Sequence, residues 1–245
     1  MLPEWCWVFI DGVWSIGLGF TLPLSKPAAV MAPTRPTSSL LGSQTMFSAL
    51  GVLFIHYIFY FTTLNVLFSS DWYDCRRWEK DDISNTLWIG DNYETETMFL
   101  VIGGQFISTA ITYNFGYEWR GNWFSNVKFV GFVIAMAVLH LYILLVPGYV
   151  SCLFRVNCDN ENVLRSIAQW ELVPLQNHWN TTVMPTGYRY TLFVIIACNT
   201  ACVVLWDYLV VNGTRKRLAK KKHMHDFKPK AMAMSEMTFA GEGPV

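Results

Sequence analysis

The chain has 245 residues, of which 53% are hydrophobic, 16% aromatic and only 15% charged. Because soluble domains carry about 25% charged residues, this composition indicates a protein of the lipid bilayer. The formal net charge is zero and the basic residues gather in one tail rather than on a folded face, so no nucleic-acid partner is predicted.

Five segments are long and apolar enough to cross about 30 Å of hydrocarbon as helices. They are residues 5–24, 46–68, 97–115, 129–150 and 190–211. We therefore predict an all-α membrane protein, with a bundle of five transmembrane helices in residues 1–214 and a basic, disordered cytosolic tail in residues 215–245. The third segment is the least apolar, and its small and hydroxyl residues favour close packing inside a bundle.

The first segment has one ionisable residue, Asp11, near its middle. A carboxylate at the bilayer centre costs about 2.5–3.5 kcal/mol on insertion scales, so such residues usually face a polar cavity or a partner. Glu4 precedes Asp11 by about two helical turns, which places both on one face roughly 10 Å apart. Two carboxylates so arranged suit a cation path, and Asp11 and Glu4 are the candidate substrate-binding residues. The alternative is that Asp11 only hydrogen-bonds to neighbouring helices.

The basic residues predict the orientation of the bundle. One set of loops, together with the tail, holds twelve lysines and arginines, whereas the opposite set holds six. The excess places the tail in the cytosol and Met1 on the lumenal or extracellular side. A chain that starts there, four residues before its first span and without a signal peptide, is expected to be a fragment or a truncated gene model.

The predicted lumenal segments hold twelve of the eighteen acidic residues, which could raise the local concentration of cations. A solvated acidic loop without a role is the alternative. Cys152 and Cys158 are candidates for a disulfide across a short loop, which would leave Cys75 single, but spacing alone leaves the pairing open. Asn180 begins an Asn-Thr-Thr glycosylation acceptor on the same side.

No pattern of a soluble catalytic site is present: there is no Walker-type glycine loop, zinc-ligand spacing, nucleophile elbow or kinase signature. No catalytic residue and no metal ligand is therefore predicted. His56 and His140 stand alone within spans, and we expect each to make structural hydrogen bonds. The largest loop has about forty residues, too few for an ATP-binding domain, so the chain alone should not hydrolyse ATP.

Several short motifs resemble one family of membrane proteins. The stretch Phe9-Ile10-Asp11 through Ser25-Lys26-Pro27-Ala28, followed by Arg35-Pro36-Thr37, is similar to the C-terminal membrane region of P-type ATPases. The best match is the fifth subfamily, in its B branch of polyamine-transporting pumps. Asn92-Tyr93-Glu94 and Gln105-Phe106 resemble the entry to that branch's eighth span and the glutamine within it. The five spans correspond to spans six to ten, so the resemblance covers about residues 1–215.

This resemblance implies a role in transport. Asp11 matches the sixth-span aspartate that helps to bind the polyamine, and Glu4 stands where relatives have a second acidic residue. The family uses ATP and Mg²⁺ to phosphorylate an aspartate in an Asp-Lys-Thr-Gly motif, which this chain lacks together with the actuator and nucleotide domains. The implied partners are the lipid bilayer, a missing N-terminal pump portion or another protein that supplies helices, and a polyamine or other cation. The implied location is an endosomal, lysosomal or vacuolar membrane.

Two other functions remain open from the sequence. The chain could be a non-catalytic multi-span subunit or scaffold derived from such a pump. The third possibility is an independent five-span channel or receptor, which no motif in the sequence supports.

Overall fold

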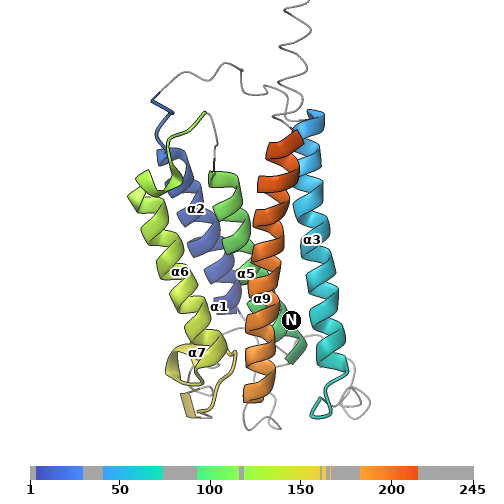
Figure 1. Ribbon diagram of the computed structural model, residues 1–245. Helices are drawn as coiled ribbons and strands as arrows, with labels where there is room; N and C mark the ends of the chain where they lie inside the picture. The colour runs from blue at the N-terminus through green and yellow to red at the C-terminus, as the bar shows by residue number, and fades with distance from the viewer. Residues whose placement is uncertain are drawn as a thin grey trace, which may run out of the picture.

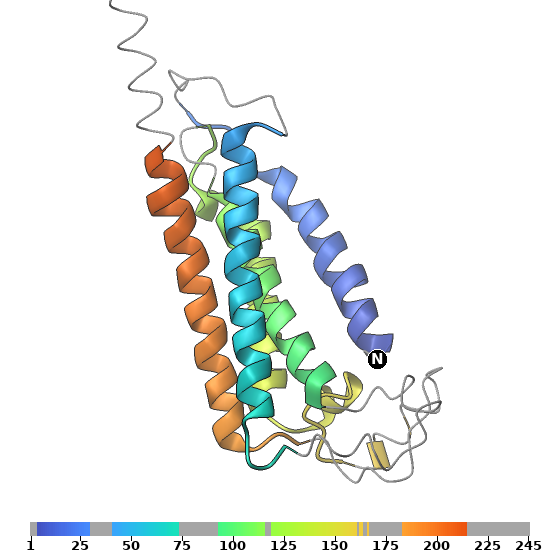
Figure 2. The same ribbon diagram turned by 90° about the vertical axis from the view of Figure 1, so that its right-hand side faces the viewer.

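The computed structural model describes residues 4–29, 41–73, 93–115, 119–160, 162–163, 166 and 183–214. Within these residues the protein is an all-α bundle whose long helices lie roughly along one common axis (Figures 1 and 2). The predicted tail and Asn180 lie outside the described residues, so their predicted properties stay predictions.

The first helix runs without a break from residue 4 to residue 24. Its parts are α1 (Glu4–Trp7), the π-helix η1 (Val8–Ser15), α2 (Ile16–Thr21) and the 3-10 turn η2 (Leu22–Leu24). The later helices are α3 (Ser43–Phe68), α5 (Tyr93–Asn114), the 3-10 turn η4 (Trp123–Ser125), α6 (Val127–Leu145), α7 (Tyr149–Leu153) and α9 (Thr186–Leu205), which continues as the π-helix η5 (Trp206–Val211).

Successive long helices alternate in direction, so the bundle has two distinct ends (Figure 1). We call the end that holds residues 24, 43, 114, 127 and 211 the tail end. The opposite end, with residues 4, 68, 93, 145 and 186, is the loop end.

Four helical segments are long and apolar enough to span a membrane: Trp5–Leu24, Thr45–Phe68, Val127–Leu145 and Thr186–Thr214. The protein is therefore an integral, multi-pass membrane protein. The third predicted span is also helical, as α5, but it is not among these four because its polar residues lower its hydropathy. α5 packs against α3, α6 and α9, and most of its residues are buried. Its small and hydroxyl side chains thus face other helices rather than lipid.

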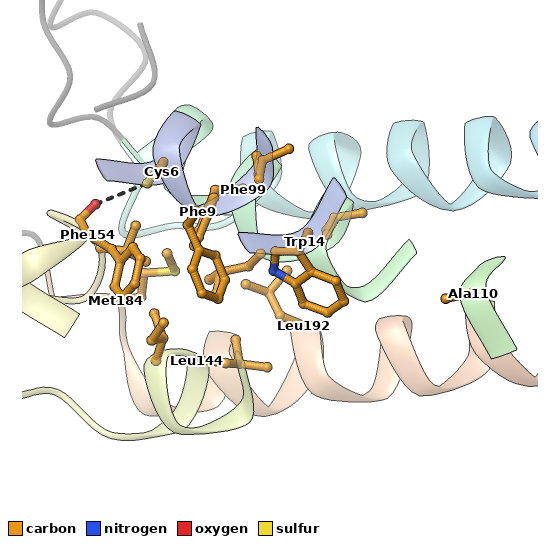
Figure 3. Packing of buried hydrophobic residues seen from close by; sticks show 14 of the residues in the cluster. Cys6, Phe9, Trp14, Phe99, Ala110, Leu144, Phe154, Met184 and Leu192 are labelled. Carbon is orange, nitrogen blue, oxygen red and sulfur yellow. Dashed lines mark hydrogen bonds between the residues drawn. The ribbon is translucent and has the colours of Figure 1, made fainter. Parts of the chain in front are cut away.

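Aromatic side chains from the first helix anchor it to the bundle (Figure 3). Phe9 lies against Phe99 of α5 and Phe154, with ring centroids 6.3 and 5.0 Å apart. Trp14 is fully buried and lies 6.2 Å from Phe106. Aromatic pairs of this kind contribute about 0.5–1.5 kcal/mol each beyond burial. One face of the first helix packs against the bundle and the opposite face is left exposed. The buried residues are Cys6, Phe9, Ile10, Trp14 and Leu18.

α5 and α6 approach closely at Gly103. A Cβ atom built there would lie 2.3 Å from Cε1 of His140, so only glycine fits. The His140 ring is buried, and its Nε2 lies 2.7 Å from the carbonyl oxygen of Leu100 in α5. His140 therefore makes the structural hydrogen bond that the sequence predicted.

At the loop end, a disulfide joins Cys152 and Cys158, six residues apart. Cross-linking a loop this short should stabilise the folded state by about 2 kcal/mol, mainly by restricting the unfolded chain. We expect the C152A/C158A double variant to lose about that much free energy of unfolding, measured by denaturant titration in detergent. The matched control is C198A/C202A, which removes the two exposed free thiols of α9. Equal stability of the two double variants would contradict the prediction.

Candidate functional site

Asp11 lies within η1 on the exposed face of the first helix. The buried residues Phe9, Ile10 and Trp14 turn toward the bundle, which leaves Asp11 on the outward side. No other residue in the described part of the chain hydrogen-bonds to its carboxylate. The described helices therefore do not bury Asp11 as a structural group.

The backbone around Asp11 is a π-helix. π-Helical turns are rare in proteins, and those that do occur are often at functional sites. The hydroxyl of Ser15 donates to the carbonyl oxygen of Ile10 at 3.1 Å, which adds a side-chain bond to this wider winding. Glu4 begins α1, but its side chain lies outside the described residues. The common face of Glu4 and Asp11 was predicted for an α-helix with 3.6 residues per turn. A π-helical turn holds more residues and changes the angle between the two side chains, so their common face stays a prediction.

Small side chains follow Asp11 on the same exposed side toward the tail end, whereas the exposed Trp7 and Val8 precede it. Gly12, Ser15 and Gly19 are all exposed, and a Cβ atom on Gly19 would meet nothing within 4 Å. We call Asp11, Gly12, Ser15 and Gly19 the Asp11 face. Small residues let the backbone of another helix approach closely within a membrane. The Asp11 face thus combines an intramembrane carboxylate with room for a neighbouring helix or a substrate.

The last span contains a second aspartate in a π-helix, which makes a useful contrast. Asp207 of η5 is only 4% exposed, and its Oδ1 accepts a hydrogen bond from the Ser48 hydroxyl of α3 at 3.3 Å. Asp207 therefore has a protein partner within the bundle. Asp11 has no hydrogen-bond partner among the described residues. This favours a partner that lies outside the described residues.

A polar cluster joins α3, α5 and α9 at a different place in the bundle. Nδ1 of His56 lies 3.1 Å from Oδ1 of Asn199, and its Nε2 lies 2.9 Å from the Thr109 hydroxyl. The side chain of Gln105 donates to the backbone carbonyl of His56 at 3.0 Å. Because an amide oxygen only accepts, these partners assign the proton to Nδ1 and leave Nε2 to accept from Thr109. His56 thus makes structural hydrogen bonds, as predicted.

We expect His56→Leu to lower the free energy of unfolding by about 1–2 kcal/mol, because interhelical hydrogen bonds in membranes contribute about 0.6 kcal/mol on average. Unfolding in mixed detergent micelles, followed by circular dichroism, measures the loss. The control is Phe54→Leu, at a site that is 67% exposed on the same helix. If both variants are equally stable, the cluster contributes nothing measurable.

The remaining predicted sites divide into those the structure describes and those it does not. Cys152 and Cys158 are disulfide-bonded in the structure, whereas Cys75 and Asn180 lie outside the described residues. Across the described residues, no group of three His, Cys, Asp or Glu side chains is placed to hold a metal ion.

No family model matches the chain. The chain is 26% identical to polyamine-transporting ATPase 13A3 of Homo sapiens over 258 aligned residues, which cover 91% of this chain and 18% of that protein. It is 25% identical to the protein of the same name from Macaca fascicularis over 163 residues, which cover 60% of this chain and 13% of that protein. The chain therefore spans less than a fifth of the length of these relatives. The resemblance to polyamine-transporting P-type ATPases is confirmed as a similarity over most of the chain.

Proposed function

We propose that this chain is the C-terminal transmembrane part of an ATP-driven polyamine or cation transporter, and that Asp11 and Glu4 contribute to the substrate path. One observation carries the proposal: an intramembrane carboxylate, in a chain similar to polyamine-transporting ATPases, is exposed on the bundle without a partner among the described residues. The tail end would face the cytosol, and the membrane would be endosomal, lysosomal or vacuolar.

The energetics of Asp11 support this proposal. Facing lipid, the carboxylate would cost about 2.5–3.5 kcal/mol, so a polar or cationic partner is expected to cover it. Further helices of a longer protein could supply one wall of such a site, because the Asp11 face has room for close approach. A protonated amine entering between those helices and Asp11 would form a charge-assisted hydrogen bond, which is stronger than a neutral one.

ATP and Mg²⁺ would act elsewhere in the complete transporter. In this proposal, phosphorylation takes place on domains that precede the present chain, and the five helices contribute to substrate binding alone. The lipid bilayer and the N-terminal pump portion would be its partners.

The first test is long-read sequencing of the transcript upstream of the Met1 codon. An open reading frame that continues into an Asp-Lys-Thr-Gly motif and its hinge region would support the proposal. A transcript that starts at Met1, with no such exons, would overturn it in favour of the non-catalytic subunit or scaffold. In that case a partner protein would have to cover Asp11.

A further inference from the structure

A cavity of about 630 Å³ opens at the loop end of the bundle, beyond the C-terminus of α6. Its walls include Tyr142 of α6, Tyr149 of α7, and Asp159 and Asn160 from the segment that follows the disulfide. None of its lining residues belongs to the first helix, so the cavity is separate from the Asp11 face. Its volume lies within the range of about 300–1,000 Å³ that is usual for small-molecule sites.

The lining favours a cation. Among the lining residues Asp159 alone carries a formal charge, and its side chain is exposed. Tyr149 is 71% exposed and Tyr142 is 41% exposed, so both rings are accessible to a ligand. An ammonium group is attracted to the face of an aromatic ring and pairs with a carboxylate. An anion would meet only the negative charge of Asp159.

The wall that carries Asp159 is firmly held. The disulfide between Cys152 and Cys158 ends one residue before Asp159, and the residues between the two cysteines are buried except for Leu153. On the other side, Oδ1 of Asn160 accepts a hydrogen bond from the backbone N–H of Val163 at 3.2 Å. A carboxylate placed on a constrained segment loses less conformational entropy when it binds a ligand.

We propose that this cavity, which we call the tyrosine pocket, binds an aliphatic ammonium group. Asp159 is the counter-ion, and Tyr142 and Tyr149 are the aromatic walls. The ligand is either a free oligoamine or the choline headgroup of a lipid, since both present a cationic nitrogen. The choice of an oligoamine as the physiological ligand rests on the proposed function, for which the pocket would collect substrate at the loop end before it reaches Asp11.

The test measures spermidine binding to the full chain in maltoside detergent by isothermal titration calorimetry. We expect Asp159→Asn and Tyr149→Leu each to raise the dissociation constant about two- to fivefold, the usual effect of losing an ion pair or a cation–π contact at an exposed site. Tyr149 is largely exposed, so its replacement should leave the elution volume in gel filtration unchanged. The matched control is Asp71→Asn, an exposed acid at the same end but outside the pocket.

Two results would contradict the proposed ammonium site. One is unchanged spermidine binding in Asp159→Asn, and the other is an equal loss of binding in Asp71→Asn, which would indicate unspecific attraction to acidic loops.

Competition with glycerophosphocholine identifies which ligand the pocket binds. If glycerophosphocholine displaces spermidine at a similar concentration, the ligand is a lipid headgroup. If it does not, the ligand is a free oligoamine. Either result supports a pocket for an ammonium group. Transport is assayed separately for Asp11→Asn in the complete transporter. Loss of binding in Asp159→Asn with unaltered transport in Asp11→Asn would retain the pocket and reject the proposed role of Asp11 in the substrate path.

Discussion

In the complete transporter, the Asp11→Asn variant is expected to need at least about tenfold more polyamine for half-maximal stimulation of ATP hydrolysis. The substitution keeps the size of the side chain but removes the negative charge, and a hydrogen bond to a charged group contributes about 1.5–3 kcal/mol. Since 1.4 kcal/mol corresponds to tenfold in an equilibrium constant, this loss sets the expected shift. The measurement is phosphate release from the purified transporter in detergent with added lipid, titrated with spermidine or spermine.

A stability measurement separates a binding role from a structural one. Because Asp11 is exposed on the described bundle, Asp11→Asn should leave the melting temperature of the present chain unchanged. The matched control is Asp207→Asn, the same replacement in the other π-helix, where the side chain is buried and bonded to Ser48. Asp207→Asn should not alter the amine dependence. If the half-saturating amine concentration is unchanged in Asp11→Asn, Asp11 does not contact the substrate.

Hydropathy predicted where four of the long helices lie, because each of these is a continuous apolar run that can span the membrane. The fifth, α5, is less apolar and is buried mainly by other helices. Hydropathy did not predict the π-helical winding around Asp11 and Asp207, since that winding changes neither composition nor length. Nor could it show which side of the first helix faces the bundle: that depends on Phe9 and Trp14 meeting partners such as Phe99.

The cluster around His56 was foreseen only in part. Its hydrogen bonds were expected, but its partners Thr109 and Asn199 lie 53 and 143 residues away in the sequence. Only the packing of three helices brings them together. One signal was available: Gln105 and Thr109 stand four residues apart and so share a face of α5, which marks a polar stripe toward a neighbour. The tyrosine pocket left no comparable signal, because its walls come from a helix end and a loop.

One fully buried side chain, Asn157, holds together the described residues at the two ends of the connection between α7 and α9. Its Nδ2 donates to the carbonyl oxygens of Ile143 and Leu144 at 3.4 and 3.3 Å, near the C-terminus of α6. Its Oδ1 accepts from the backbone N–H of Met184 at 3.3 Å, just before α9. Its own N–H donates to the buried carboxylate of Glu96 at 3.2 Å. Asn157 thus links α5, α6 and the start of α9 at the loop end.

We expect Asn157→Ala to lower the free energy of unfolding by about 2–4 kcal/mol. Three side-chain hydrogen bonds are lost, and the carbonyl and amide groups they satisfied stay buried. The backbone adds to the cost, because φ at this residue is 53°, a left-handed conformation that asparagine tolerates better than alanine. The measurement is denaturant-induced unfolding of the full chain in detergent, monitored by tryptophan fluorescence.

Two further variants test the separate contributions to this loss. Asn122→Ala removes an exposed asparagine whose Oδ1 accepts a single bond from the N–H of Phe124, and it should cost well under half as much. Asn157→Gly also loses the three side-chain bonds but relieves the left-handed backbone, so it should be more stable than Asn157→Ala. Equal stability of the alanine and glycine variants would show that the backbone conformation contributes nothing. If Asn157→Ala were as mild as Asn122→Ala, the buried bonds would not hold the loop end, and the fixed position of Asp159 would need another cause.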